Sequence, residues 1–227
     1  MTDNTINAQA AQALRHARSD LSADAIQDPP SSFDARIPLT QKIIAIGAST
    51  GGAQAIERVL RDVCEDCPGL LIVQHMPQKF TRSFAKRLHM MSPIEVKEAA
   101  HHDLVLPGRA LVAPGGAHLL LMREGQQYYV EVVDGPLVNR YKPSVDVLFR
   151  SVAKAAGSNA VGIIMTGMGD DGARGMRELF DSGAATYAQD QGSCAVYGMP
   201  REAVLGGGVG EMIALENISS LIDRYAN

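Results

Sequence analysis

The chain has 227 residues, of which 46% are hydrophobic and 20% are charged, as is ordinary for a globular protein. Its net charge of −4 gives no overall attraction for nucleic acid or for an anionic membrane. Three cysteines are too few for a disulfide framework, no apolar run approaches the length of a transmembrane helix, and the polar N-terminus lacks a signal-peptide core. We therefore expect a cytoplasmic protein with no membrane insertion and no nucleic-acid partner.

The first 40 residues differ in composition from the rest of the chain. They are polar and rich in alanine, with a possible short helix over residues 8–18 and a linker-like Asp-Pro-Pro-Ser-Ser stretch at 28–32. We predict a polar tail and linker over residues 1–40 and one domain over residues 41–227. Deleting the tail is expected to leave catalysis largely unchanged.

After residue 40 the pattern alternates between short apolar runs and amphipathic segments. The predicted strands are 43–46, 70–74, 109–113, 119–123, 128–133, 160–165 and 184–189. The predicted helices are 54–62, 81–90, 143–156, 172–182 and 219–225, with Pro143 suited to a first helical turn. This alternation predicts a doubly wound α/β fold. Its sheet is mostly parallel with helices on both faces, and a short antiparallel hairpin turns at residues 125–127.

A glycine-rich turn directly follows the first predicted strand. The sequence Gly47-Ala48-Ser49-Thr50-Gly51-Gly52 places a serine where a strand passes into a helix, in the Gly-x-Ser-x-Gly pattern of a nucleophile elbow. The small residues allow a sharp turn and the close approach of a substrate carbonyl. A serine of ordinary pKa still needs a base, and the base needs a group to orient it.

The ends of two other predicted strands supply candidates for these roles. His75 ends the second strand, and residues 166–172 after the strand 160–165 contain Asp170 and Asp171. Ligands of open α/β sheets bind beyond the carboxyl ends of the strands, so these side chains are expected to lie along one edge. Serine, histidine and an acid together have the composition of a hydrolytic triad. The chain order Ser, His, Asp differs from the Ser, Asp, His order of α/β-hydrolases, which excludes that template.

Other interpretations of the glycine-rich turn, the cysteines and the remaining histidines are less well supported by the sequence. The glycine-rich turn could cradle a phosphate, but a dinucleotide site needs Gly-x-Gly-x-x-Gly and an acid at the end of the second strand, where the chain has Gln74-His75. Cys64 and Cys67 have C-x-x-C spacing but no second pair for zinc, and they follow a helix rather than open one. His101 and His102 fit a solvated turn better than a metal site. We expect no metal and no cofactor.

Six sequence blocks, in order over roughly residues 42–215, carry a family resemblance. They are Ile46–Gly52, Gln74–Pro77 followed by Phe80–Ala85, Ala113–Gly116, Lys142–Asp146, Thr166–Gly172 and Gly198–Ala203. Together they resemble the chemotaxis protein-glutamate methylesterases, the CheB family. The resemblance implies a serine hydrolase that demethylates glutamate γ-methyl esters on chemoreceptors, releasing methanol, and that often also deamidates receptor glutamines.

The resemblance also implies residue roles. The family's nucleophile matches Ser49 and its base matches His75, while its aspartate, the residue directly before glycine in Gly-Met-Gly-x-Asp-Gly, matches Asp171. Asp170 stands where the family often has a small residue, so the two adjacent acids are alternatives at this stage. The oxyanion hole requires N–H donors, for which the backbone amides of Met168 and Thr50 are candidates.

The family's usual architecture places a phosphorylatable receiver domain before the esterase, and 40 residues cannot form one. We expect either constitutive activity or control by a separate regulatory protein. The expected partners are the methylated cytoplasmic helices of chemoreceptors. Two alternatives stay open: a non-catalytic receptor- or partner-binding module of the same fold, and an esterase or amidase for a small molecule.

Overall fold

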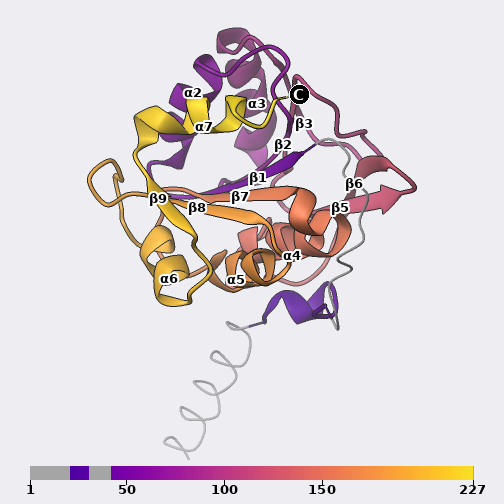
Figure 1. Cartoon of the computed structure of the whole chain (residues 1–227). Coiled ribbons are helices and arrows are strands. Elements are labelled where there is room, and N and C mark those ends of the chain that lie inside the picture. The colour runs from indigo at the N-terminus through magenta and orange to yellow at the C-terminus, as the bar shows by residue number, and fades with distance from the viewer. Residues whose placement is uncertain (1–20, 31–41, 227) are drawn as a thin grey trace, which may run out of the picture.

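The computed structural model describes residues 21–30 and 42–226, and its centre is a seven-stranded parallel sheet (Figure 1). The strand order is β3-β4-β2-β1-β7-β8-β9, and a separate two-stranded antiparallel sheet pairs β5 with β6. The strands are β1 (Ile43–Ala48), β2 (Gly69–Gln74), β3 (Glu95–Glu98), β4 (Arg109–Val112), β5 (His118–Glu124), β6 (Gln127–Val133), β7 (Ala160–Ile164), β8 (Ala185–Gln189) and β9 (Glu211–Ile213). The predicted doubly wound α/β fold with its antiparallel hairpin is confirmed.

Helices cover both faces of the sheet. The longer ones are α2 (Gly52–Arg61), α3 (Gln78–Met91), α4 (Val145–Ala156), α5 (Ala173–Asp181), α6 (Met199–Leu205) and α7 (Ile218–Asp223). In Figure 1, α2, α3 and α7 lie on one face, while α4, α5 and α6 lie on the other. Each helical layer packs its own hydrophobic cluster against the sheet. None of the helices within the described ranges is long and apolar enough to cross a membrane.

The central strands are continuous apolar runs because both of their faces are covered. Every residue of β1, β2 and β7 is buried. A parallel sheet with helices on both sides has no solvated face, so its strands lose the alternation of polar and apolar residues. This is why the predictions over 43–46, 70–74 and 160–165 are close to the observed strands.

Among the described strands and α-helices, β3, β9 and α6 were not predicted, and each is short or lies at an edge. The strands β3 and β9 are the two edges of the main sheet, and β3 has the charged sequence Glu-Val-Lys-Glu. Charged side chains are a common feature of edge strands and mask the strand pattern. The helix α6 has only seven residues. The helix predicted from Pro143 begins at Val145, because Ser144 is its N-cap and accepts a hydrogen bond from the Val147 amide.

Residues 21–28, here called the N-terminal strap, pack against the domain. The strap contains a short 3-10 helix, Ala23–Ala25, and Ala23 is buried in a small cluster with Leu120, Val138 and Val147. Figure 1 shows the strap beneath α4 and α5. The helix expected over residues 8–18 and the second half of the linker-like stretch lie outside the described residues.

Candidate functional site

Ser49 lies directly after the C-terminal end of β1, in the turn that leads into α2. Its amide donates to the carbonyl of Thr166 across the sheet at 3.0 Å. Gly51 has a φ of +80°, a left-handed conformation that favours glycine. A Cβ on Gly167 would lie 2.8 Å from the Ser49 Cβ, so glycine is also needed at the neighbouring strand end. The turn therefore holds the serine hydroxyl at the edge of the sheet.

His75 is the neighbour of Ser49 on the adjacent strand. The register of β1 and β2 pairs Ala48 with Gln74, the last residues of the two strands, and Ser49 and His75 directly follow them. The His75 amide donates to the Ala48 carbonyl at 3.1 Å. The Gln74 side chain donates to the carbonyls of both Ser49 and His75, at 2.9 and 3.0 Å. The sheet register thus sets the relative positions of the serine and histidine.

Asp171, rather than Asp170, contacts the histidine. Oδ2 of Asp171 lies 2.7 Å from Nε2 of His75, and the Asp171 side chain is fully buried. The Asp170 side chain is 65% exposed and lies 3.5 Å from Arg140. A buried acid that orients the ring of a histidine is the arrangement used in hydrolytic triads.

The carboxylate of Asp171 also receives hydrogen bonds from the start of α4 and from Asn139. Oδ1 accepts from Ser144 Oγ at 2.7 Å and from Asn139 Nδ2 at 2.8 Å, and Oδ2 accepts from the Val145 amide at 2.7 Å. Burial alone raises the pKa of Asp171, but the hydrogen bonds and the charge of His75 bring that pKa below its usual value. The positive end of the α4 dipole acts in the same direction. The acid is therefore held ionised.

The second nitrogen of the histidine ring has no partner within the described residues. His75 Nδ1 is buried without a hydrogen bond, while Nε2 faces Asp171. A carboxylate that accepts from Nε2–H leaves the lone pair on Nδ1. Tyr141 stacks on the imidazole, with ring centroids 3.6 Å apart and an interplanar angle of 6°. The ring is thus held at Nε2 by Asp171 and on one face by Tyr141, and the unpaired Nδ1 is available as a proton acceptor.

Two backbone amides beside Ser49 are available as donors. Within the described residues, neither the Thr50 amide nor the Met168 amide donates to a backbone carbonyl of the surrounding turns. Thr50 starts the turn into α2, and Met168 lies in the loop after β7 with 63% of its surface exposed. Free amides of this kind can stabilise an oxyanion.

The sequence reasoning missed Asn139 and Tyr141, which contact the acid and the histidine respectively. They belong to a tight turn in which Val138 and Tyr141 exchange backbone hydrogen bonds and in which Asn139 and Arg140 have φ values of +48° and +74°. Asn tolerates this left-handed conformation, which is a weak turn signal in the sequence. Nothing local to residues 138–141 indicates that they contact Asp171 and His75.

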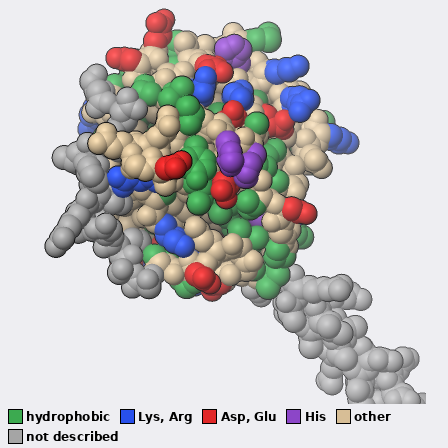
Figure 2. Space-filling view, turned by 90° about the vertical axis from the view of Figure 1, so that its right-hand side faces the viewer, with side chains coloured by type: hydrophobic (Ala, Val, Ile, Leu, Met, Phe, Trp, Pro, Cys, Tyr) green, Lys and Arg blue, Asp and Glu red, His purple; other side chains and the backbone are tan. Residues whose placement is uncertain are grey.

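The described residues also contain a group of possible metal ligands that includes no member of the triad. Of the described residues, His101, His102 and Glu131 form a group with ligand atoms within 4.8 Å of one another. The face shown in Figure 2 has histidine and acidic side chains side by side at its centre. His101 Nδ1 already accepts from the Val132 amide, and a neutral imidazole in that state carries its proton on Nε2. The group therefore lacks the preset geometry of a metal centre.

The cysteines have environments unsuited to redox or nucleophilic chemistry. Burial and nearby Asp223 raise the pKa of Cys64 to about 12 and that of Cys67 to about 11. Burial raises the pKa of Cys194 to about 11. Because the thiolate is the reactive form, these thiols are inert at neutral pH.

Comparisons with known proteins place the chain in a family. Residues 44–222 match the family model described as CheB methylesterase. A Chromobacterium violaceum protein named protein-glutamate methylesterase/protein-glutamine glutaminase 2 is 61% identical over 91% of this chain and 58% of its own length. A Pseudomonas savastanoi pv. phaseolicola protein, with the same name but numbered 1, is 58% identical over 90% of this chain and 57% of its own length. The chain thus spans a little under three-fifths of these curated relatives.

A solved structure agrees with the sequence comparisons. The crystal structure of the Thermotoga maritima CheB methylesterase catalytic domain superposes with a TM-score of 0.79 at 31% identity, and covers 82% of this chain and 99% of that domain. With a matching family model over most of the described domain and this structural neighbour, the chain belongs to the CheB methylesterase family.

Proposed function

We propose that this chain is a serine hydrolase that removes methyl groups from glutamate γ-methyl esters of chemoreceptors and also deamidates receptor glutamines. The observation that carries the proposal is the state of His75, whose Nε2 pairs with the buried Asp171 while Nδ1 has no partner, at a residue that directly follows β2 as Ser49 follows the neighbouring β1. The names of the similar proteins, protein-glutamate methylesterase/protein-glutamine glutaminase, supply the substrate class.

In the proposed mechanism, Ser49 is the nucleophile and His75 is the base. Ser49 Oγ attacks the ester carbonyl carbon, and Nδ1 of His75 takes the hydroxyl proton. Asp171 stabilises the imidazolium that forms. When the tetrahedral intermediate collapses, the bond to the methoxy oxygen breaks and methanol leaves with the proton from Nδ1. Water then attacks the glutamyl-enzyme by the same route, releasing the glutamate carboxylate and restoring Ser49.

The negative oxygen of each tetrahedral intermediate needs donors that are already in place. The amides of Thr50 and Met168 suit this role because they flank Ser49 and have no intramolecular acceptor in the described structure. The N-terminus of α2 begins at Gly52 and adds a positive dipole on the same side. Losing one such donor typically costs about 3–4 kcal/mol in the transition state.

A protein substrate fits the surroundings of the site better than a small molecule. Exposed apolar side chains lie in the segments next to the triad: Phe80 follows His75, Leu137 precedes the Val138–Tyr141 turn, and Met168 precedes Asp171. Exposed apolar side chains around a site are typical of protein-binding surfaces. We infer that this rim receives the methylated helices of a cytoplasmic chemoreceptor domain.

The test is methanol release from a methylated chemoreceptor signalling fragment. The wild type should release methanol, Ser49→Ala should release none above the uncatalysed background, and Ser220→Ala, which alters an exposed serine, should match the wild type. A fragment that binds without losing methyl groups would favour the non-catalytic binding module. Turnover of small esters without turnover of the fragment would favour the small-molecule alternative.

A further inference from the structure

The turn Val138–Tyr141 contacts two members of the triad at once. Asn139 Nδ2 donates to Asp171 Oδ1 at 2.8 Å and to Asp146 Oδ2 at 2.6 Å, so that one amide group lies between two carboxylates. Tyr141 covers the face of His75. Asn139 and Arg140 both occupy the left-handed region, which costs free energy for side chains other than glycine and persists only where surrounding contacts enforce it.

Besides its own hydrogen bonds, this turn is held by contacts from the N-terminal strap. The amide of Asn139 donates to the carbonyl of Leu21 at 2.9 Å. Val138, at the base of the turn, is fully buried and packs with Ala23. The side chain of Ile26 lies against Gly135, where an added Cβ would be 2.4 Å from Ile26 Cδ1. The strap therefore contacts the backbone of the residue whose side chain holds the catalytic acid.

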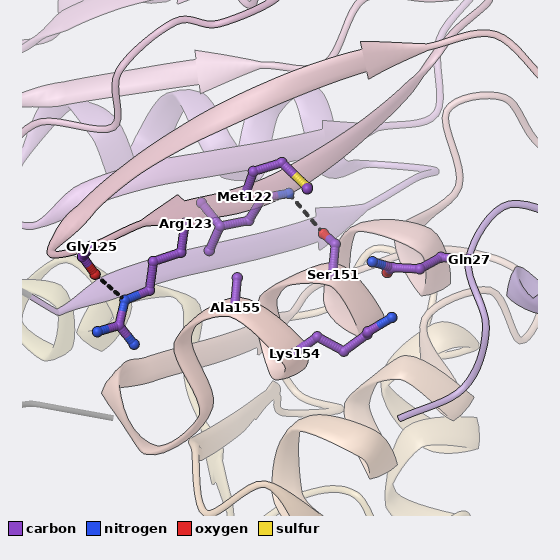
Figure 3. Close-up of a pocket in the computed structure, with 8 residues that line it drawn as sticks. Gln27, Met122, Arg123, Gly125, Ser151, Lys154 and Ala155 are labelled. Atoms are coloured by element: carbon purple, nitrogen blue, oxygen red, sulfur yellow. Dashed lines mark hydrogen bonds between the residues drawn. The ribbon is translucent and has the colours of Figure 1, made fainter. Parts of the chain in front are cut away.

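The strap is itself anchored by charged groups of α4. Arg150 is fully buried, and its Nη1 donates to Asp24 Oδ1 and to the carbonyl of Gln27. Nη2 of Arg150 pairs with Glu178 of α5, so this guanidinium links the strap to two helices. Figure 3 shows Gln27 beside Ser151 and Lys154, along a surface pocket between α4 and β5. Without the strap, the buried guanidinium of Arg150 would lose its hydrogen bonds to Asp24 and Gln27. A buried charge that lacks partners is costly in free energy.

We propose that Asn139 is a positioning residue for Asp171 and that the docked strap holds Asn139 in place, so that full activity depends on residues 21–28. The inference rests on the proposed function only in taking Asp171 as the triad acid. It differs from the sequence-based expectation that deleting residues 1–40 leaves catalysis largely unchanged. In this arrangement the strap contributes to the geometry of the site without touching the substrate.

The first experiment separates the effect of the side-chain amide of Asn139 from the effect of the backbone conformation of the turn. Asn139→Gly removes the amide but keeps the left-handed backbone accessible, whereas the matched control Arg140→Gly relaxes the turn and keeps the amide. The rate of Ser49 phosphonylation by a fluorophosphonate reports on the triad without needing the natural substrate. We expect Asn139→Gly to slow labelling by about 10- to 100-fold, as for losing one hydrogen bond to a charged group, and Arg140→Gly to label like the wild type.

A steady-state readout separates positioning from a loss of structure. With the receptor fragment, Asn139→Gly should lower kcat by a similar factor and leave KM within about twofold of the wild type, because Asn139 contacts the acid and not the substrate. If Asn139→Gly labels at the same rate as the wild type and has an unchanged kcat, the inference is overturned and the proposed function stays intact. A wild-type protein that fails to label at Ser49 overturns the proposed function instead.

The second experiment tests the strap in the full chain. Ala23→Asp places a carboxylate in the buried contact with Val138, and the matched control Ala25→Asp places one on the exposed side of the same short helix. We expect Ala23→Asp to speed hydrogen exchange of the residue 139 amide and to slow labelling of Ser49, with Ala25→Asp unchanged in both. Added to Asn139→Gly, Ala23→Asp should change labelling by no more than about twofold, because both changes act through one residue.

Two results contradict the role of the strap. Fast exchange at residue 139 with wild-type labelling in Ala23→Asp would show that the strap and the acid are independent. Full protection of the residue 139 amide together with slow labelling in Ala23→Asp would show that labelling falls without any release of Asn139 by the strap.

Discussion

The two ends of the His75 ring lie in contrasting surroundings. On the acid side, Asp171 is fully buried and accepts hydrogen bonds from His75, Asn139, Ser144 and the first amides of α4. On the serine side, the turn at Thr50 and the loop at Met168 are exposed, and their amides have no acceptor among the described backbone groups. The acid side thus has its hydrogen bonds in place, whereas on the serine side the two amides have no acceptor, as their proposed role in binding an oxyanion requires. In the proposed mechanism the acid needs no rearrangement during the reaction, and the amides of Thr50 and Met168 are free to bind the oxyanion of the transition state.

The largest expected effect comes from breaking the acid side. Asp171→Asn should lower kcat by about 10⁴, because an amide at this position no longer stabilises the imidazolium or its tautomer. Asp170→Asn is the matched control, and its exposed side chain should leave kcat within about twofold of the wild type. The measurement is methanol release at saturating receptor fragment, with thermal unfolding to show that both variants fold. The opposite ranking of the two variants would reassign the acid.

A smaller effect is expected from displacing the serine side. In Gly167→Ala the new Cβ would lie 2.2 Å from Met199 Sδ and 2.8 Å from Ser49 Cβ, so the loop carrying Met168 must shift. Displacing reacting groups by about 1 Å can cost about 10² in rate, and we expect kcat to fall by a factor of that order. Gly192→Ala, whose added Cβ would meet no atom closer than 4.0 Å, should behave as the wild type. Equal rates for the two variants would mean that the close contact at Gly167 does not position Ser49.

The smallest effect concerns the anchor of the strap, and it depends on pH. Hydrogen bonds from Arg150 and from Ser22 lower the pKa of Asp24 below its usual value of 3.8. An acid with a lowered pKa in the folded state stabilises the protein above its unfolded pKa, and this stabilisation is lost as the pH falls through the folded pKa. Because the Asp24 side chain is 43% exposed, we expect no more than about 1 kcal/mol.

Thermal unfolding of Asp24→Asn and the wild type at several pH values measures this contribution. The wild type should be the more stable protein at pH 7, and the difference should vanish at the acid end, where Asp24 is protonated in both states. A difference of equal size at every pH would assign the effect to packing rather than to the charge of Asp24.

The sequence was informative wherever structure follows from local pattern. Apolar runs indicate β1, β2 and β7, and the carboxyl ends of such strands are where Ser49, His75 and Asp171 were expected. The contacts of Asn139 with Asp171 and of Tyr141 with His75 join segments far apart in the chain, and residues 134–142 have no periodicity that would reveal them. The docking of the strap could not be predicted either. Its apolar contacts come from Ala23 and Ile26, which lie in a polar stretch and form no pattern. The roles of Ser49, His75, Asp171, Thr50 and Met168 stay predictions until the variants are measured.

The unpartnered Nδ1 of His75 has a consequence for how accurately the reaction is aligned. Nδ1 is bonded to Cγ, whereas Nε2 is farther from the main chain, so a rotation about the Cα–Cβ bond moves Nδ1 less than it moves Nε2. With Nε2 facing Asp171, the nitrogen that receives the proton in the proposed mechanism is the one nearer the main chain. In the proposed mechanism, its position relative to Ser49 depends mainly on the two main chains, which neighbouring strands hold about 4.8 Å apart. In that mechanism, the backbone hydrogen bonds between β1 and β2 set how far the proton acceptor lies from the nucleophile.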